Sequence, residues 1–249
     1  MTPLDGVAIA AAGVVAGAIN AIVGSGSLIT FPTLLAVGYP PVLANVTNCV
    51  GMWPGSVSGS IGYRRELTGQ RGRVMRLMPA SVIGGLAGAA LLLALPGAFG
   101  DVVPGLILLA VLLVLIQPRA AARRARRGRA AEHPGPVLHA GTFLTAVYGG
   151  YFGAAQGVIL LALLGITLDD DLQRLNGVKN VVIAVVNALA AFYFMAFADV
   201  AWLAVPILYV SSVVGGQLGS HYGRRIRPDV LRILIAVIGT AVAVKLLLD

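Results

Sequence analysis

Long stretches with no Asp, Glu, Lys or Arg occupy most of this chain and restrict the folds open to it. They cover residues 7–63, 77–100, 102–118, 140–168, 181–198 and 200–223. A helix that crosses the hydrocarbon core of a bilayer needs about 20 predominantly apolar residues, and these stretches supply that length several times. They do not alternate between apolar and polar residues, as the strands of a membrane β-barrel do. The sequence therefore predicts an all-α integral membrane protein.

Composition and charge support this class. Hydrophobic residues make up 58% of the 249 residues and charged residues 11%, and the mean hydropathy is +0.89, far from the balance of a soluble protein. The net charge of +8 comes mainly from clusters at 63–76, 118–129 and 223–232. Excess Lys and Arg in short loops marks the cytoplasmic side, so the charge indicates topology and not a nucleic-acid partner. No basic residue precedes Arg64, so we expect no cleaved signal peptide.

The chain repeats itself at a spacing of 131 residues. The matches at this spacing, without a gap, are Gly26 with Gly157, Asn45 with Asn176, and SVIGGLAG (81–88) with SVVGGQLG (212–219). Transporters are often built from two such repeats. We therefore expect a single membrane domain, 1–249, made of repeat one (1–117), a cytoplasmic basic linker (118–136) and repeat two (137–249).

Each repeat is expected to hold a hairpin followed by three crossings. The hairpins fall near 7–38 and 137–168, and the crossings near 41–63, 74–95, 101–117, 172–197, 200–221 and 228–247. A hairpin that begins and ends on one side, followed by three crossings, leaves the second repeat upside down relative to the first. The prediction is two inverted-topology repeats with about eight transmembrane helices, some broken or re-entrant, an arrangement that permits alternating access.

Small and polar residues interrupt both hairpins. The first interruption reads GSGS (24–27) and the second GAAQG (153–157). Irregular backbone at membrane depth is tolerated only where protein or a wet cavity covers it, and breaks at corresponding positions of two repeats point to a binding site. Helix N-termini at such breaks offer free N–H groups and a positive dipole end. We therefore expect an anion as the ligand.

Polar residues on the helices after the breaks complete the candidate site. Asn176, Lys179 and Asn180 are spaced to share one helix face, and Lys179 is a costly cation inside a predicted membrane helix, which indicates a function. No Asp or Glu lies in the middle of an apolar stretch, and the single cysteine, Cys49, has no metal-type spacing, so we expect neither a cation site, a metal nor a cofactor. The predicted substrate-binding residues are Asn20, Ser25, Gly26, Ser27, Asn45, Asn48, Gln156, Gly157, Asn176, Lys179 and Asn180.

Each of these features also has an interpretation without a ligand. The glycine pairs, such as Gly84 with Gly88, could serve close helix packing. Lys179 could extend to the cytoplasmic surface, and Asn45 and Asn176 could form hydrogen bonds between helices. Gln156 and the serines could cap the broken helices. Two rival functions also stay open: an anion channel with the same groups, and an intramembrane enzyme with a GSG serine, although no histidine lies deep in a helix as its base.

At these positions the sequence resembles the sulfite exporter TauE/SafE family. The matching segments are NAIVGSGSLITFPTLLAVGYPPVLANVTN and GSVSGSIGYRREL in the first half, then YGGYFGAAQGVILLALLG and RLNGVKN in the second. The resemblance covers almost the whole chain. It implies a multi-pass secondary transporter of the bacterial plasma membrane, built from about eight spans in two repeats. It also implies that the partners are the lipid bilayer and a small sulfur-containing anion, sulfite or an organosulfonate, moved generally outward.

Overall fold

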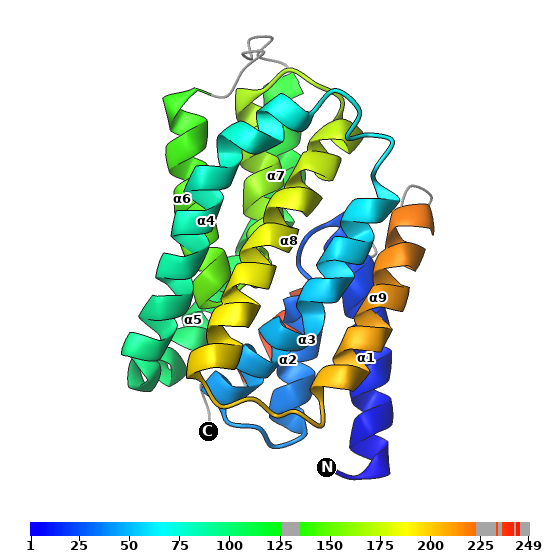
Figure 1. Cartoon of the computed structure of the whole chain (residues 1–249), viewed down its shortest axis with the longest axis vertical. Coiled ribbons are helices and arrows are strands. Elements are labelled where there is room, and N and C mark those ends of the chain that lie inside the picture. The colour runs from blue at the N-terminus through cyan, green and yellow to red at the C-terminus, as the bar shows by residue number, and fades with distance from the viewer. Residues whose placement is uncertain (126–134, 223–232, 234–235, 242, 245–249) are drawn as a thin grey trace.

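The computed structural model describes residues 1–125, 135–222, 233, 236–241 and 243–244 (Figure 1). Its helices are α1 (Pro3–Ile22), α2 (Ser27–Ala36), α3 (Pro41–Gly62), α4 (Arg71–Ala94), α5 (Pro96–Ala125), α6 (Pro136–Tyr151), α7 (Gln156–Thr167), α8 (Leu172–Phe197) and α9 (Val205–Tyr222). The last basic cluster lies outside the described residues, and the expected linker and last crossing lie partly outside them.

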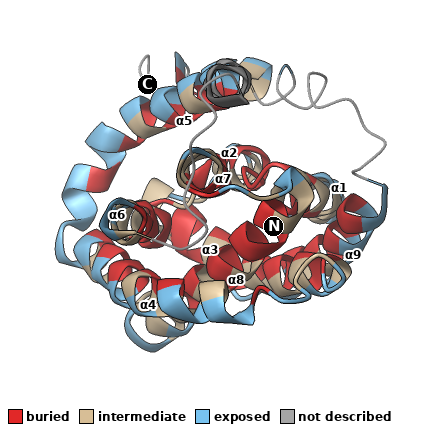
Figure 2. Cartoon of the chain, turned by 90° about the horizontal axis from the view of Figure 1, so that it is seen from above, coloured by how far each residue is buried: buried red, intermediate tan, exposed pale blue. Residues whose placement is uncertain are grey.

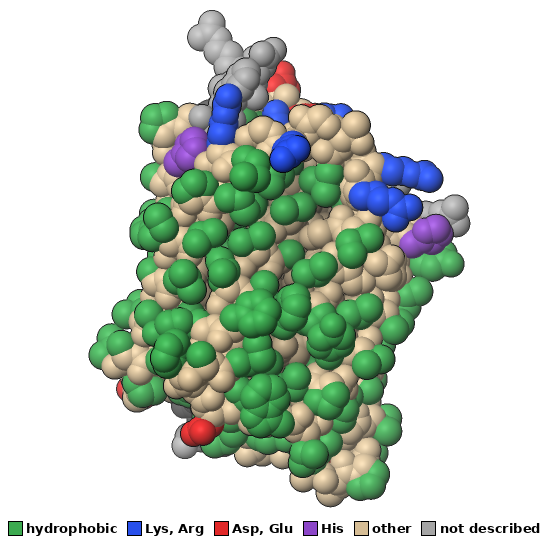
Figure 3. Space-filling view, in the orientation of Figure 1, with side chains coloured by type: hydrophobic (Ala, Val, Ile, Leu, Met, Phe, Trp, Pro, Cys, Tyr) green, Lys and Arg blue, Asp and Glu red, His purple; other side chains and the backbone are tan. Residues whose placement is uncertain are grey.

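Helix length and surface composition fit a membrane environment. Among the described residues, α1, α4, the part Pro96–Ile116 of α5, and α8 are each long and apolar enough to cross a bilayer. Apolar side chains cover the flank seen in Figure 3, and Lys and Arg side chains gather at its upper end, where α4 and α8 begin. The all-helical class predicted from the sequence is confirmed, and these features agree with an integral membrane protein.

Local sequence signals begin several of the helices. Pro41 and Pro136 stand in the first turn of α3 and α6, where the missing N–H of proline has no helical partner to lose. Asp171 precedes α8, and its carboxylate accepts hydrogen bonds from the N–H groups two and three residues later, at 2.8 and 3.3 Å. Such caps fix where a helix starts. The crossings expected at 41–63 and 172–197 accordingly match α3 and α8 to within a residue.

Helix α4 begins at Arg71 rather than near residue 74, and two other helices begin further from their expected positions. Helix α5 begins at Pro96 rather than near residue 101, because proline is favoured in a first helical turn. Helix α9 begins at Val205 rather than near residue 200. The N–H of Ala201 donates to Thr47 Oγ1 at 3.0 Å, and this contact belongs to a turn that delays the helix.

Both hairpins break at a glycine with a positive φ angle. Gly24 has φ of 83° and Gly153 has φ of 78°, a conformation that glycine adopts without steric cost. Each glycine donates its N–H to the carbonyl five residues earlier, Ile19 O at 3.1 Å and Tyr148 O at 3.2 Å. This is a helix-ending hydrogen bond of the left-handed type. The breaks predicted in the two hairpins are therefore confirmed, with the same geometry in each.

The spacing between the hairpins is 129 residues, and not the expected 131. Gly24 and Gly153 are equivalent by conformation, so Gly26 corresponds to Ala155, and its expected pairing with Gly157 is wrong. The 131-residue spacing holds beyond the hairpins, since α3 begins at residue 41 and α8 at residue 172. The difference of two arises because α7 has 12 residues and α2 has 10.

Helices from opposite halves of the chain pack against each other in two sets. Helix α1 lies along α9, α6 lies along α4, and α3 and α8 pack against each other near the centre (Figure 2). Helices α1 and α6, the first arms of the two hairpins, begin at opposite ends of the molecule (Figure 1). In each set the first arm of one hairpin packs against a helix from the other half of the chain.

Glycines allow these helices to approach at backbone distance. A Cβ atom on Gly88 of α4 would lie 2.0 Å from Val147 O of α6, and one on Gly219 of α9 would lie 2.5 Å from Ala18 O of α1. Neither contact leaves room for a side chain. The interpretation of the repeated glycines as close-packing residues is confirmed. Gly88 and Gly219 are also 131 residues apart in the sequence.

Candidate functional site

The two helix breaks touch each other. The N–H of Gly157 donates to Gly24 O at 2.9 Å, and a Cβ on either glycine would lie 2.4 Å from the Cα of the other. Two N–H groups near the helix starts are taken up by local turns, since Leu28 bonds to Ser25 O and Val158 to Ala155 O. These two N–H groups, together with that of Gly157, are therefore engaged within the chain.

A small pocket lies beside this contact, between α2, α3, α8 and the second break. Its free volume of about 20 Å³ is enough for roughly one water molecule. Its lining includes both polar and apolar residues. The lining residues are Ser27, Asn45, Asn48, Cys49, Met52, Gly149, Gly150, Phe152, Gly153, Asn187 and Phe194. Of the predicted site residues, Ser27, Asn45 and Asn48 therefore meet here.

The two asparagines on α3 connect the pocket to both hairpins. Asn45 donates from Nδ2 to Tyr151 O, the last carbonyl of α6, at 2.9 Å. Asn48 accepts at Oδ1 from the Thr30 hydroxyl of α2 at 2.5 Å. Both side chains are nearly fully buried. Each asparagine thus makes an interhelical hydrogen bond and also presents polar atoms to the pocket wall.

Gln156 is buried without a hydrogen bond to either end of its amide. The side chain is 1% exposed, and neither Nε2 nor Oε1 has a partner in the described part of the chain. A Cβ on the pocket residue Gly149 would lie 2.2 Å from Gln156 Cδ, so the amide packs against this part of the pocket wall without lining the pocket itself. Ser25 Oγ at the other break is likewise buried and unpaired. A buried polar group without a partner costs about 1–3 kcal/mol.

The interpretation of these side chains as helix caps is wrong. Helix α2 follows Gly26 and α7 follows Ala155, and neither start has a side-chain cap hydrogen bond. Ala155 itself adopts a left-handed conformation with φ of 59°, which a residue with a Cβ rarely takes. The second break is therefore held in an uncommon geometry, with the unpaired Gln156 as its next residue.

Lys179 is fully buried and meets the end of α1. Its exposed fraction is 0%, and Nζ lies 3.5 Å from both Asn20 O and Ala21 O. Asn176 and Asn180 donate to the same Ala21 O, at 3.4 and 3.0 Å. Carbonyls at a helix C-terminus carry the negative end of the dipole and attract a cation. The interpretation that Lys179 extends to the surface is wrong, and this group does not line the pocket.

A hydrogen-bonded chain connects the Lys179 group with the pocket. The Asn20 side chain donates to Ser56 Oγ at 3.0 Å, and Asn187, a pocket residue, donates to the same oxygen at 3.1 Å. Ser56 and Asn187 are in direct contact and are 131 residues apart, the spacing at which the sequence repeats itself. Sequence reasoning missed both, although the 131-residue spacing could have paired them.

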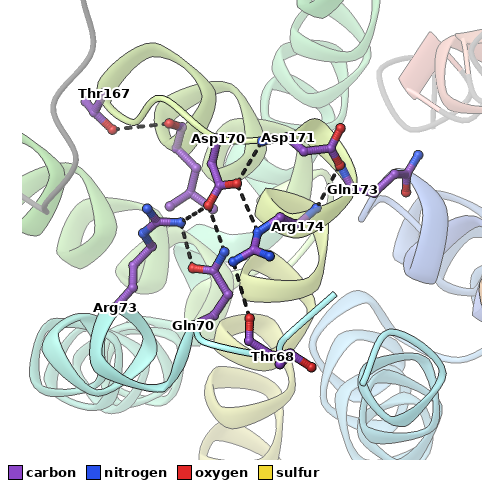
Figure 4. A network of polar contacts seen from close by, with 9 residues as sticks. Thr68, Gln70, Arg73, Thr167, Asp170, Asp171, Gln173 and Arg174 are labelled. Carbon is purple, nitrogen blue, oxygen red and sulfur yellow. Dashed lines mark hydrogen bonds and ion pairs between the residues drawn. The ribbon is translucent and has the colours of Figure 1, made fainter. Parts of the chain in front are cut away.

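At the basic end, Asp170 joins the two halves of the chain (Figure 4). Its Oδ2 accepts from Arg73 Nη1 at 2.5 Å and from Gln70 Nε2 at 2.7 Å, and its Oδ1 pairs with Arg174 Nε at 3.0 Å. Burial acts to raise the pKa of Asp170, but the hydrogen bonds from Arg73 and Gln70, that from the N–H of Asp171, and the charge of Arg174 together lower it from 3.8. The carboxylate therefore stays ionised in a cationic setting.

Acid is expected to remove the stabilisation that Asp170 provides. Because the folded-state pKa lies below the unfolded value of 3.8, this contribution is complete above that pH and is lost as the pH falls through the folded-state pKa. Between about pH 7 and pH 3, the unfolding temperature should fall further for the wild type than for Asp170→Asn. Thermal unfolding in detergent measures both slopes, and equal slopes would contradict the prediction.

Comparison with known proteins identifies the family of this chain. The model of the family "Sulfite exporter TauE/SafE" matches residues 9–246. The "Probable membrane transporter protein YfcA" of Escherichia coli (strain K12) is 26% identical over 237 residues, 94% of this chain and 86% of that protein. The "Probable membrane transporter protein ORF9" of Sinorhizobium sp is 28% identical over 254 residues, 94% and 89% of the two chains. Among solved structures, no match was found. The chain therefore belongs to the sulfite exporter TauE/SafE family and is a multi-pass membrane transporter.

Proposed function

We propose that this protein exports a small sulfur-containing anion, sulfite or an organosulfonate, across the bacterial plasma membrane by alternating access. Membership of the family supports the transported class, and the relatives are named as membrane transporters. The proposed site lies between the two helix breaks. It includes the pocket and the buried polar groups around it.

The reciprocal packing supports a pair of inverted repeats. Two hairpins that start at opposite ends of the molecule (Figure 1) and break at equivalent glycines are what an inverted duplication gives. The proposed division is repeat one at 1–117, the basic linker at 118–136, and repeat two at 137–249, within one domain. Six crossings and two hairpins give the proposed eight spans. Motion of one repeat against the other would then expose the site on either side in turn.

The unpaired amide of Gln156 is the observation that carries the assignment. Polar groups buried within a membrane protein are normally satisfied internally, because no water reaches them in lipid. An amide that is 1% exposed, unpaired and pressed against a pocket wall is therefore suited to a ligand. The pocket is smaller than a sulfur oxyanion, so its walls must separate for binding, as alternating access requires.

The donors around the site favour an anion. Amide groups of Asn45, Asn48 and Asn187 and the hydroxyl of Ser27 line the pocket, and no carboxylate is among the lining residues. Lys179 is the only Lys, Arg, Asp or Glu of the described residues with a fully buried side chain. Neutral donors with one cation can replace the hydration shell of a small oxyanion.

The charge distribution supports outward transport. Lys and Arg gather at the end where α4 and α8 begin (Figure 3), and that end is proposed to face the cytoplasm. An interior-negative membrane potential then drives an anion outward by about 2.3 kcal/mol per charge per 100 mV. Export would need no second coupled ion.

Two rival functions have less support. A channel would share the same polar groups, and flux through liposomes separates it from a carrier, because only a carrier shows saturable counterflow of labelled sulfite. An intramembrane hydrolase would need a base beside the serine of GSGS. Ser25 Oγ has no hydrogen-bond partner in the described chain, so no base is in place to activate it.

Replacing Gln156 by methionine is expected to weaken sulfite binding by about tenfold while leaving the protein as stable as before. The lost binding follows from one missing hydrogen bond to the anion. Stability is retained because the amide makes no hydrogen bond within the described structure. Calorimetric titration with sulfite and thermal unfolding measure the two quantities.

The matched control is Gln217→Met. Gln217 donates from Nε2 to Ser58 O and Ser58 Oγ, at 3.0 and 2.9 Å, so its loss should lower stability and leave sulfite binding unchanged. Tight sulfite binding by a folded Gln156→Met protein would remove Gln156 from the site. Absence of sulfite binding by the wild type would contradict the proposed function.

A further inference from the structure

We propose that Asn176, Lys179 and Asn180, together with Gln156, form a second anion pocket that opens toward the basic end when the first pocket closes. This inference rests on the proposed function and extends it to the alternate conformation. In the structure the first pocket is a small cavity, whereas the residues of the second pocket are packed against the end of α1. Transport would then pass the anion from one to the other.

The repeat relates the residues of the second pocket to those of the first. On α3 the pocket wall carries Asn45, Asn48 and Cys49, and the 131-residue spacing, which holds for α3 and α8, places Asn176, Lys179 and Asn180 at the equivalent positions of α8. The 129-residue spacing of the hairpins relates Ser27, which lines the first pocket, to Gln156. Every polar group that lines the first pocket from α2 and α3 thus has a polar counterpart.

The residues of the second pocket are packed against α1 through contacts that leave some of their hydrogen-bond donors and acceptors unpaired. Asn176 and Lys179 reach carbonyls of α1 only at 3.4 to 3.5 Å, whereas Asn45 reaches its carbonyl at 2.9 Å. Asn176 Oδ1 and both atoms of the Gln156 amide have no partner in the described chain. Long bonds and unpaired atoms on buried groups are costly. A ligand admitted between α1 and α8 would satisfy them.

The second pocket also carries the positive charge. Lys179 occupies the position that corresponds to Asn48, so the second pocket has an ammonium group where the first has a neutral amide. An ammonium binds an anion more strongly than an amide does. The pocket that faces the cytoplasm would therefore load the anion, and the neutral pocket on the other side would release it.

The Asp170 network is placed to hold the second pocket shut. Arg73 and Gln70 come from the start of α4 and the loop before it, and Arg174 comes from the first turn of α8, two residues before Asn176 (Figure 4). Asp170 binds all three. Separation of α8 from the first repeat at this end requires the contacts of Asp170 with Arg73 and Gln70 to break.

Cys49 and Asn180 provide matched reporters, because they are repeat equivalents and Cys49 is the only cysteine of the sequence. Reaction of Cys49 with a membrane-impermeant maleimide reports the first pocket. The Asn180→Cys, Cys49→Ser double variant reports the second, and Asn176→Cys in the same background is an alternative if that protein is unstable. Labelling is measured in intact cells and in inside-out vesicles, with and without Asp170→Asn.

We expect Cys49 to react from the outer face and the double variant to react from the cytoplasmic face. Adding Asp170→Asn should speed labelling of the double variant and slow labelling of Cys49. Two results would overturn the second pocket. One is that the double variant shows no detectable labelling even with Asp170→Asn, and the other is that the labelling rates at the two cysteine positions rise together. Protection of Cys49 from labelling by added sulfite tests the proposed function separately. If sulfite protects Cys49 but the two labelling rates do not change in opposite directions, only the second pocket is rejected.

Discussion

Replacing Gly157 by alanine is expected to destabilise the protein by at least about 1–3 kcal/mol, the usual cost of overpacking, and to abolish transport. The added Cβ would lie 2.4 Å from the Cα of Gly24, and backbone cannot yield as the end of a flexible side chain can. The hydrogen bond from Gly157 N to Gly24 O, at 2.9 Å, would also be strained. Thermal unfolding in detergent and sulfite efflux from liposomes measure the two effects.

Gly105→Ala is the control for this substitution. Gly105 is an exposed residue of α5, and a Cβ there would meet no atom within 4 Å. Alanine is also a better helix former than glycine, so this variant should be at least as stable as the wild type and fully active. If Gly157→Ala behaves in the same way, the two breaks do not need to touch for folding or for transport.

Replacing Lys179 by methionine is expected to reduce sulfite affinity by about 10- to 100-fold, the value of a hydrogen bond to a charged group, and to stop net export. Methionine keeps the length and apolar stem of lysine, so the packing between α1 and α8 should survive. The ammonium group that this substitution removes is the only fully buried charged group among the described residues. Calorimetric titration and liposome efflux test the prediction.

Arg76→Met controls for the loss of a positive charge as such. Arg76 is an exposed residue of α4 near the basic end, and its replacement should leave sulfite affinity unchanged. A folded Lys179→Met protein that binds sulfite with wild-type affinity would exclude Lys179 from the anion site. Its contacts with the carbonyls of Asn20 and Ala21 would then be structural alone.

The sequence was most informative at residues whose chemical character differs from that of the apolar residues around them. Lys179 is conspicuous because a cation in an apolar helix is costly, and the glycines at 24 and 153 are conspicuous because they interrupt apolar hairpins. The predicted crossings agree closely with α3 and α8, and proline and aspartate signals mark the starts of these two helices. These features are local, so spacing and composition reveal them.

Features that depend on distant contacts could not be predicted in this way. Asn187 is a single polar residue in an apolar stretch, and only the fold brings it to Ser56. The pairing of Asp170 with Arg73, 97 residues away, depends on how the loop before α8 meets the start of α4. The 129-residue spacing of the hairpins was hidden because α7 is two residues longer than α2. Gln156 was predicted as a site residue, but its lack of partners is visible only in three dimensions.

The contact between Gly24 and Gly157 has a mechanical consequence for the proposed transport cycle. The two breaks of the chain touch through backbone atoms, and rotation of one repeat about this contact would move its two ends in opposite directions. Opening one entrance would then narrow the other through geometry alone, with no need for two independently timed gates. A membrane barrier would be kept throughout the cycle, so the ion gradients of the cell would not leak away while the anion crosses.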